Sequence, residues 1–187
     1  WIIPISTCWF ATVVGIAGSA ASVFIMGPEL VRGCRLFPVS TPDTAALAFG
    51  GLAGLIISWF LLQKGIIKRS YETNEAEEAK LSESEPDYND RLEVTREILY
   101  LLPVILCSVT GLWISRYLTG WVGFIQHPVI NLVLGSVWGY FVGCGVVWTT
   151  RILGTYAFGK EAMGLGDVHL MGAAGTIIGA NYVVIAF

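Results

Sequence analysis

Five long apolar runs constrain the fold of this chain more than any other feature. They cover Ile5–Met26, Thr44–Leu62, Ile98–Leu118, Val129–Thr149 and Val168–Phe187. Each is close to the roughly 17–25 residues that a helix needs to cross a bilayer, whereas transmembrane β-strands are about half as long. Only helices satisfy all their backbone groups in lipid without a neighbour. The sequence therefore predicts an all-α, polytopic transmembrane helix bundle.

One polar segment, 64–97, separates the second and third runs. Between Glu72 and Glu97 it has ten acidic and three basic residues, a local net charge of −7. This composition is typical of a solvated, disordered loop, and no basic patch for nucleic acid is present. We expect residues 1–187 to form one membrane-embedded domain with this loop inserted. Because the sequence begins and ends within apolar residues, we expect it to be a piece of a longer protein, truncated at both ends.

The distribution of Lys and Arg predicts the orientation in the membrane. The acidic loop has six of these residues and the connection 151–166 has two, whereas the connections on the other side have three in total. Cytoplasmic loops are enriched in Lys and Arg, so both connections are expected in the cytoplasm. Two crossings separate them, so they must share one side. The same parity places Trp1–Pro4 on that side.

Glycines at a spacing of four predict close contacts between helices. Gly135, Gly139 and Gly143 form one such series, and Gly175 and Gly179 form another. Small residues at this spacing let helices approach closely in lipid. This pattern is common in membrane proteins and does not itself indicate catalysis. It indicates that the last apolar run is a packed, interior helix.

A single carboxylate, Asp167, stands where that last run begins. Gly164 and Gly166 precede it, and the run Val168–Phe187 contains no Asp, Glu, Lys or Arg. A carboxylate at the edge of the lipid is costly to keep charged and by default marks function. The two glycines allow the backbone to bend or to approach another chain. Asp167 is therefore the leading candidate for a catalytic residue.

The residues around Asp167 also resemble a known family. The string Gly-Leu-Gly-Asp-Val-His-Leu-Met, Gly164–Met171, resembles the GxGD signature of the type IV prepilin peptidases, as do the residues on either side of it. Members typically have Lys two residues after the aspartate, where this chain has His169. The resemblance implies a multi-pass aspartyl endopeptidase of the inner (cytoplasmic) membrane that needs no cofactor. Its implied substrates are the leaders of prepilin or pseudopilin precursors, cleaved at the cytoplasmic face.

The resemblance also implies a second aspartate. Hydrolysis without a covalent intermediate needs one carboxylate to activate water and one protonated carboxyl to polarise the carbonyl. Two close carboxyls share a proton because both cannot ionise together. In the family the first aspartate lies shortly before an Ile-Pro pair, and Ile3-Pro4 matches that pair. We therefore expect the partner aspartate just before Trp1, outside residues 1–187.

The acidic residues within the chain are weaker candidates for this partner. Asp43 and Glu29 fall on the opposite side of the membrane by parity. Glu93 and Glu97 fall on the same side as Asp167, at the expected start of a helix. Acidic residues commonly stand there because they complement the helix dipole, and this reading is favoured over a catalytic one.

Three polar residues near Asp167 have two interpretations each. Lys160 and Glu161 are either solvated charges at the interface or residues that orient the turn or contact the substrate. His169 either faces the lipid headgroups or touches the catalytic pair. A lone His without Cys or acidic ligands nearby does not make a metal site, so no metal is expected.

Two other functions remain open at this point. Asp167 is also compatible with a transporter or membrane scaffold in which it binds an ion or relays protons. A peptidase that has lost its activity and serves as an assembly scaffold is the third reading. The presence of the partner aspartate distinguishes the last reading from an active enzyme.

The acidic loop gives a first prediction. Leaders of prepilins are short and basic, and the net charge of −7 between Glu72 and Glu97 can concentrate them electrostatically. Replacing the Asp and Glu residues of 72–87 by Asn and Gln is expected to slow cleavage of a basic leader at low ionic strength and to matter little at high ionic strength. Initial cleavage rates across a salt series measure this. An unchanged rate at low ionic strength would support the solvated linker.

Overall fold

The structure, a computed structural model, is helical. It describes residues 5–33, 37–66, 90–118, 123, 125, 127–158 and 163–187, and for Ile5, Arg32, Gly33 and 90–93 it describes the backbone alone. In chain order the helices are α1 (Ile5–Met26), α2 (Pro28–Gly33), α3 (Pro42–Gln63), α5 (Asp90–Tyr117), α7 (Pro128–Phe158), α8 (Leu165–Ile178) and α9 (Ala180–Ala186). The described residues contain no strand, and the predicted all-α bundle is confirmed.

Several helix starts follow from local sequence. The helices α2, α3 and α7 each begin at a proline, which fits the first turn because the missing N–H has no helical partner there. At α3, the backbone N–H of Thr44 donates to the Thr41 hydroxyl at 3.2 Å, and the backbone N–H of Thr41 donates to the Thr44 hydroxyl at 2.8 Å. This reciprocal cap fixes the position at which α3 begins.

Four helices are long and apolar enough to cross a membrane. They are α1, α3, α5 from Val94 onward, and α7. The helix α5 has the smallest buried share of the four, and its apolar side chains Ile105, Leu106 and Trp113 are more than half exposed. Apolar surface of this extent needs a covering, which lipid supplies. Four such helices indicate a membrane protein.

The fifth predicted span is not one continuous helix. The run Val168–Phe187 forms most of α8 and all of α9, which are separated at Gly179. Gly179 has φ 81° and ψ 166°, a conformation that glycine adopts easily and that side chains with a Cβ rarely adopt. Its N–H still donates to the Gly175 carbonyl at 2.9 Å. The prediction of five unbroken spans was therefore wrong at this position.

Two other helices extend further than predicted. The helix α5 begins at Asp90 rather than at Ile98, so the last residues of the predicted loop 64–97 are helical. The helix α7 continues to Phe158, nine residues beyond the predicted Thr149. At 31 residues it is about 46 Å long. These extensions contain charged residues that the sequence analysis had placed in connections.

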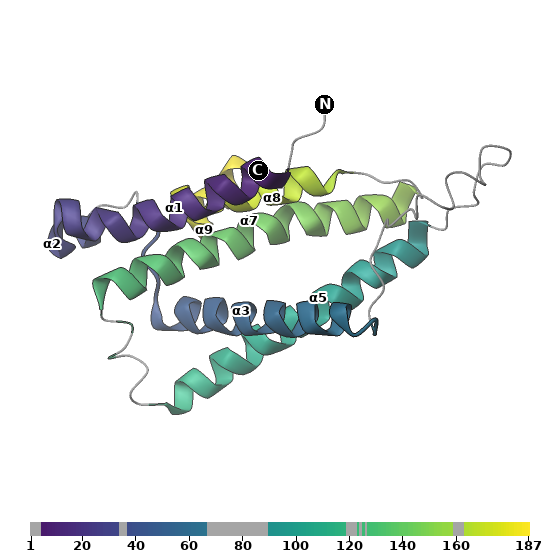
Figure 1. Cartoon of the computed structure of the whole chain (residues 1–187), viewed down its shortest axis with the longest axis horizontal. Helices are drawn as coiled ribbons and strands as arrows, with labels where there is room; N and C mark the ends of the chain where they lie inside the picture. Colours follow the sequence, from purple (N-terminus) through teal and green to yellow (C-terminus); the bar gives the residue numbers. More distant parts are fainter. Residues whose placement is uncertain are drawn as a thin grey trace, which may run out of the picture.

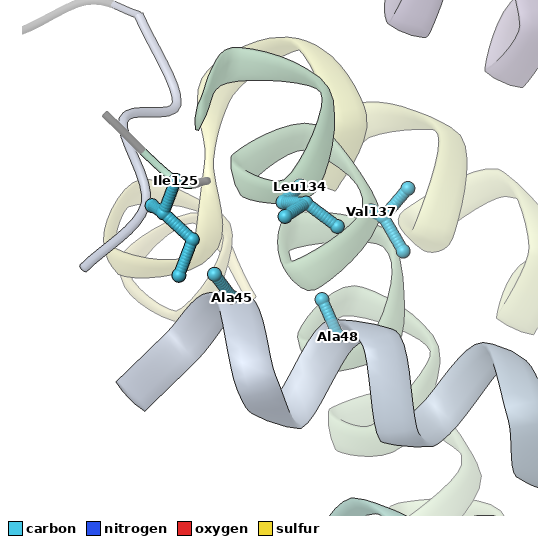
Figure 2. Packing of buried hydrophobic residues seen from close by; sticks show 5 residues of the cluster. All are labelled: Ala45, Ala48, Ile125, Leu134 and Val137. Carbon is cyan, nitrogen blue, oxygen red and sulfur yellow. The ribbon is translucent and has the colours of Figure 1, made fainter. Parts of the chain in front are cut away.

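The bundle consists of two groups of helices. In one, α1, α7, α8 and α9 run together, and in the other α3 crosses α5 (Figure 1). The helices α3 and α5 are antiparallel and close: a Cβ on Gly54 would lie 2.5 Å from the Cα of Val104, and the Ser58 hydroxyl donates to the Tyr100 carbonyl at 2.8 Å. Between the groups, Ala45 and Ala48 of α3 pack with Ile125 and with Leu134 and Val137 of α7 (Figure 2).

The glycine series on α7 brings α8 into backbone contact. A Cβ on Gly139 would overlap the Gly175 carbonyl oxygen, and a Cβ on Gly143 would overlap the Met171 carbonyl oxygen. The numbering runs in opposite directions across these contacts, so the two helices are antiparallel. Gly135 instead meets the Pro38 carbonyl, in the segment before α3. The predicted close contacts therefore exist, and α8 is a packed helix.

Two glycines on α7 give a matched test of this contact. Gly139→Ala is expected to destabilise the protein by about 1–3 kcal/mol, because the methyl group must displace the α8 backbone. Gly145→Ala, on the same helix, meets nothing within 4 Å and is expected to be neutral or to stabilise by up to about 1 kcal/mol, since alanine favours helix. Thermal unfolding followed by tryptophan fluorescence in detergent measures both. Equal midpoints for the two variants would contradict the contact.

Candidate active site

The sequence-predicted site lies at one end of the bundle. The start of α8, the end of α7, the start of α5 and the end of α3 all lie at this end (Figure 1). The first turns of α1 are close to it, because the rings of Trp9 and His169 have centroids 5.9 Å apart. Asp43 and Glu29 belong to α3 and α2 at the other end of the bundle. The parity argument likewise placed Asp43 and Glu29 on the side opposite to Asp167.

Asp167 is exposed in the first turn of α8. Gly164 is the N-cap residue, and the Asp167 backbone N–H donates to the Gly164 carbonyl at 3.2 Å. A carboxylate here is favoured by the free N–H groups of the helix start. Gly164 has φ −73° and ψ 150°, which any residue adopts, so the backbone conformation does not require glycine at this position. The Asp167 side chain is therefore accessible at this end of the bundle.

His169 points toward α7 and α1. Its Nδ1 and the Tyr140 hydroxyl form a hydrogen bond of 3.0 Å, and its ring is tilted against Trp9. The ring is half-buried, so His169 packs in part against Tyr140 and Trp9. Within the described residues, no group of three or more His, Cys, Asp or Glu is arranged to hold a metal ion.

A buried ion pair, which the sequence analysis did not predict, lies beside this site. Arg151 of α7 donates from one terminal nitrogen to Glu97 Oε1 of α5 at 2.9 Å, and these side chains are 1% and 4% exposed. The indole N–H of Trp148 donates to the other carboxylate oxygen, Glu97 Oε2, at 2.9 Å. Both oxygens of Glu97 are thus engaged by α7. Glu97 is bound in this network, which does not favour it as a partner of Asp167.

The same arginine also reaches the segment before Asp167. The second terminal nitrogen of Arg151 donates to the Met163 backbone carbonyl at 2.7 Å. Met163 immediately precedes the N-cap Gly164, and its side chain packs on the cluster of Cys144, Val147 and Val168. The Glu97–Arg151 pair therefore connects α5, α7 and the start of α8.

The interpretation of Glu97 as a residue of the first helical turn that complements the helix dipole was wrong. The helix starts earlier, at Asp90, so Glu97 lies two turns inside it and faces α7. A charged residue within a membrane helix is expected to pair with an opposite charge. Glu97 directly precedes one predicted span, and Arg151 follows another span that ends on the same side of the membrane. These opposite charges at neighbouring span ends were the sequence signal for the ion pair.

Other predicted site residues lie outside the described part of the chain. They are Lys160 and Glu161, and with them most of the acidic loop. The expected partner aspartate before Trp1 lies outside the sequence itself. Comparison of the chain with known protein families, with curated proteins and with solved structures gives no match.

The ion pair gives a prediction about stability. Glu97→Leu leaves the Arg151 charge buried without its partner and is expected to cost about 3–5 kcal/mol. The double variant Glu97→Leu/Arg151→Leu is expected to be more stable than this single variant, because no unpaired buried charge remains. Glu29→Leu, at an exposed position on α2, serves as the control and is expected to change stability by under about 0.5 kcal/mol.

Chemical or thermal unfolding in detergent measures the three variants. The informative quantity is the difference between the single and the double variant, because it removes effects of the leucine itself. If Glu97→Leu were no less stable than Glu29→Leu, the pair would not be buried in the membrane-embedded protein.

Proposed function

We propose that this protein is a membrane-embedded aspartyl endopeptidase that removes leader peptides from prepilin-like precursors at the cytoplasmic membrane face. Two things support the proposal: the string Gly164–Met171 with its resemblance to the prepilin peptidases, and the placement of its aspartate. The observation that carries most weight is the contact between the first turns of α1 and α8 through Trp9 and His169. This contact supports the proposal because α1 begins at the end of the bundle where Asp167 lies.

The proposed chemistry needs two carboxyl groups, one at the start of α8 and one in the chain that precedes α1. One carboxylate removes a proton from water, whose oxygen attacks the scissile carbonyl carbon. The other, protonated, donates its hydrogen bond to the carbonyl oxygen as negative charge develops there. The intermediate then collapses as the leaving amine takes a proton. Asp167 supplies one of these groups, and an aspartate before Trp1 supplies the second.

A transporter is the second candidate function. The break between α8 and α9 at Gly179 is the observation that favours it, because interrupted helices commonly form ion sites in transporters. Asp167 is twelve residues before Gly179, about 18 Å along a helix. The carboxylate and the break are therefore too far apart to bind the same ion, and this separation favours the peptidase.

The substitution Asp167→Asn tests the proposal. It keeps the size of the side chain and removes the charge, and we expect leader cleavage to fall at least about 1,000-fold, as loss of one member of a catalytic set commonly does. Asp43→Asn, at the opposite end of the bundle, serves as the control and is expected to cleave normally. The assay uses membranes that contain the full-length protein and a prepilin substrate with a basic leader. Uncleaved substrate with the wild-type protein would favour the transporter or the scaffold.

A further inference from the structure

We propose that Arg151 is a positioning residue for Asp167: it holds the Met163 carbonyl and thereby fixes where α8 begins. Its effect on leader cleavage rests on the proposed function. Its effect on the structure of the 163–168 segment does not, because that effect follows from the hydrogen bonds alone.

Arg151 joins α5 and the segment before α8 to α7 through buried hydrogen bonds. The guanidinium is 1% exposed and makes two bonds from its two terminal nitrogens, one to Glu97 Oε1 at 2.9 Å and one to the Met163 carbonyl at 2.7 Å. Glu97 is itself held by the Trp148 indole. An ion pair alone would be a costly way to join α5 to α7, since apolar pairs of similar volume often serve as well. The bond from Arg151 to the Met163 carbonyl gives the charged pair a second role, which is to hold the segment before α8.

That carbonyl lies at the point where α8 needs support. The N-cap Gly164 has no side chain, and no side-chain hydrogen bond caps this helix. Glycine is accepted at an N-cap, but it supplies no side-chain oxygen for the first N–H groups. On its apolar side the segment is held by Met163 and Val168, which pack against Cys144 and Val147. On its polar side Arg151 holds the Met163 carbonyl.

Asp167 follows within the same first turn. Its backbone N–H bonds to the Gly164 carbonyl at 3.2 Å, so a shift of Met163 and Gly164 moves the carboxylate as well. A dyad tolerates little misplacement, because an error of about 1 Å at reacting groups can cost around 100-fold in rate. The position of the Met163 carbonyl therefore bears on the rate of the chemical step.

Lysine can replace the charge of Arg151 but not its two-pronged geometry. A single ammonium still pairs with Glu97, yet it has no rigid fork to hold Glu97 and the Met163 carbonyl together. Arg151→Lys is expected to lower kcat roughly 10–100-fold while KM changes by less than about twofold, since substrate binding elsewhere is untouched. Thr150→Ala is the control: this neighbouring hydroxyl is exposed and bonds to the Val146 carbonyl of its own helix.

Hydrogen–deuterium exchange tests the positioning role of Arg151 without an assay of cleavage. In Arg151→Lys the backbone amides of 163–168 are expected to exchange faster than in the wild type, and in Thr150→Ala to exchange at the wild-type rate. If Arg151→Lys does not fold, the neutral double variant Glu97→Gln/Arg151→Gln replaces it. This variant leaves no buried charge unpaired, and its shorter side chain at 151 also releases the carbonyl.

The outcomes separate the two proposals. Faster exchange in 163–168 together with a loss confined to kcat supports the positioning role. Unchanged exchange, or full cleavage in a variant that has lost the carbonyl bond, overturns it. If the wild-type protein does not cleave prepilin leaders, the proposed function fails, and the exchange measurement alone decides whether Arg151 fixes the start of α8.

Discussion

The backbone contact between α7 and α8 determines where Asp167 lies. Lipid supplies no hydrophobic force between helices, so their association depends on close packing and on hydrogen bonds. Gly139 and Gly143 allow the α8 carbonyls of Gly175 and Met171 to approach α7 directly. Because no side chain separates the helices at these two contacts, α8 has little freedom to slide along α7. The depth of its first turn along α7 is set by this contact.

Polar contacts fix the other elements along α7. Near its start, Asn131 exchanges hydrogen bonds with the backbone of Ser40, at 3.0 Å in both directions. Midway, Ser136 donates to Ser19 of α1 at 2.8 Å, and near its end Arg151 holds α5. Among the described residues, every buried side-chain nitrogen or oxygen has a partner. An unpaired polar group in lipid is costly, so these bonds favour one register for each neighbour of α7.

The sequence predicted those features that depend on the pattern within one segment. Uniform apolar runs of bilayer length identify four helices correctly, although α3 and α7 begin at Pro42 and Pro128 rather than at the predicted Thr44 and Val129. The break at Gly179 has no such signature, because a glycine within an apolar run is compatible with both a continuous and an interrupted helix. Asp167 was found because a charge beside lipid is unusual. The Tyr140 contact of His169 depends on a neighbour distant in sequence, and no local pattern predicts it.

Arg151 illustrates why charged residues mislead such an analysis. A charge after an apolar run normally marks the end of a span, and on that basis α7 was expected to end at Thr149. The helix continues to Phe158 because the guanidinium is neutralised by Glu97 on another helix. The cost of burying each charge can be judged only when both are seen together.

The helix α7 extends past the start of α8, where the candidate site lies. The Cys144 thiol donates to the Val168 carbonyl at 3.4 Å, so the first turns of α8 lie beside the midpoint of α7. From Cys144 to Phe158 are fourteen residues, about 21 Å of helix. The start of α8 therefore lies alongside α7 rather than at its outermost end, and the Asp167 side chain is exposed there. The close approach of Gly15 of α1 to Thr176 of α8 and the contact of Trp9 with His169 keep the starts of α1 and α8 at the same end of the bundle.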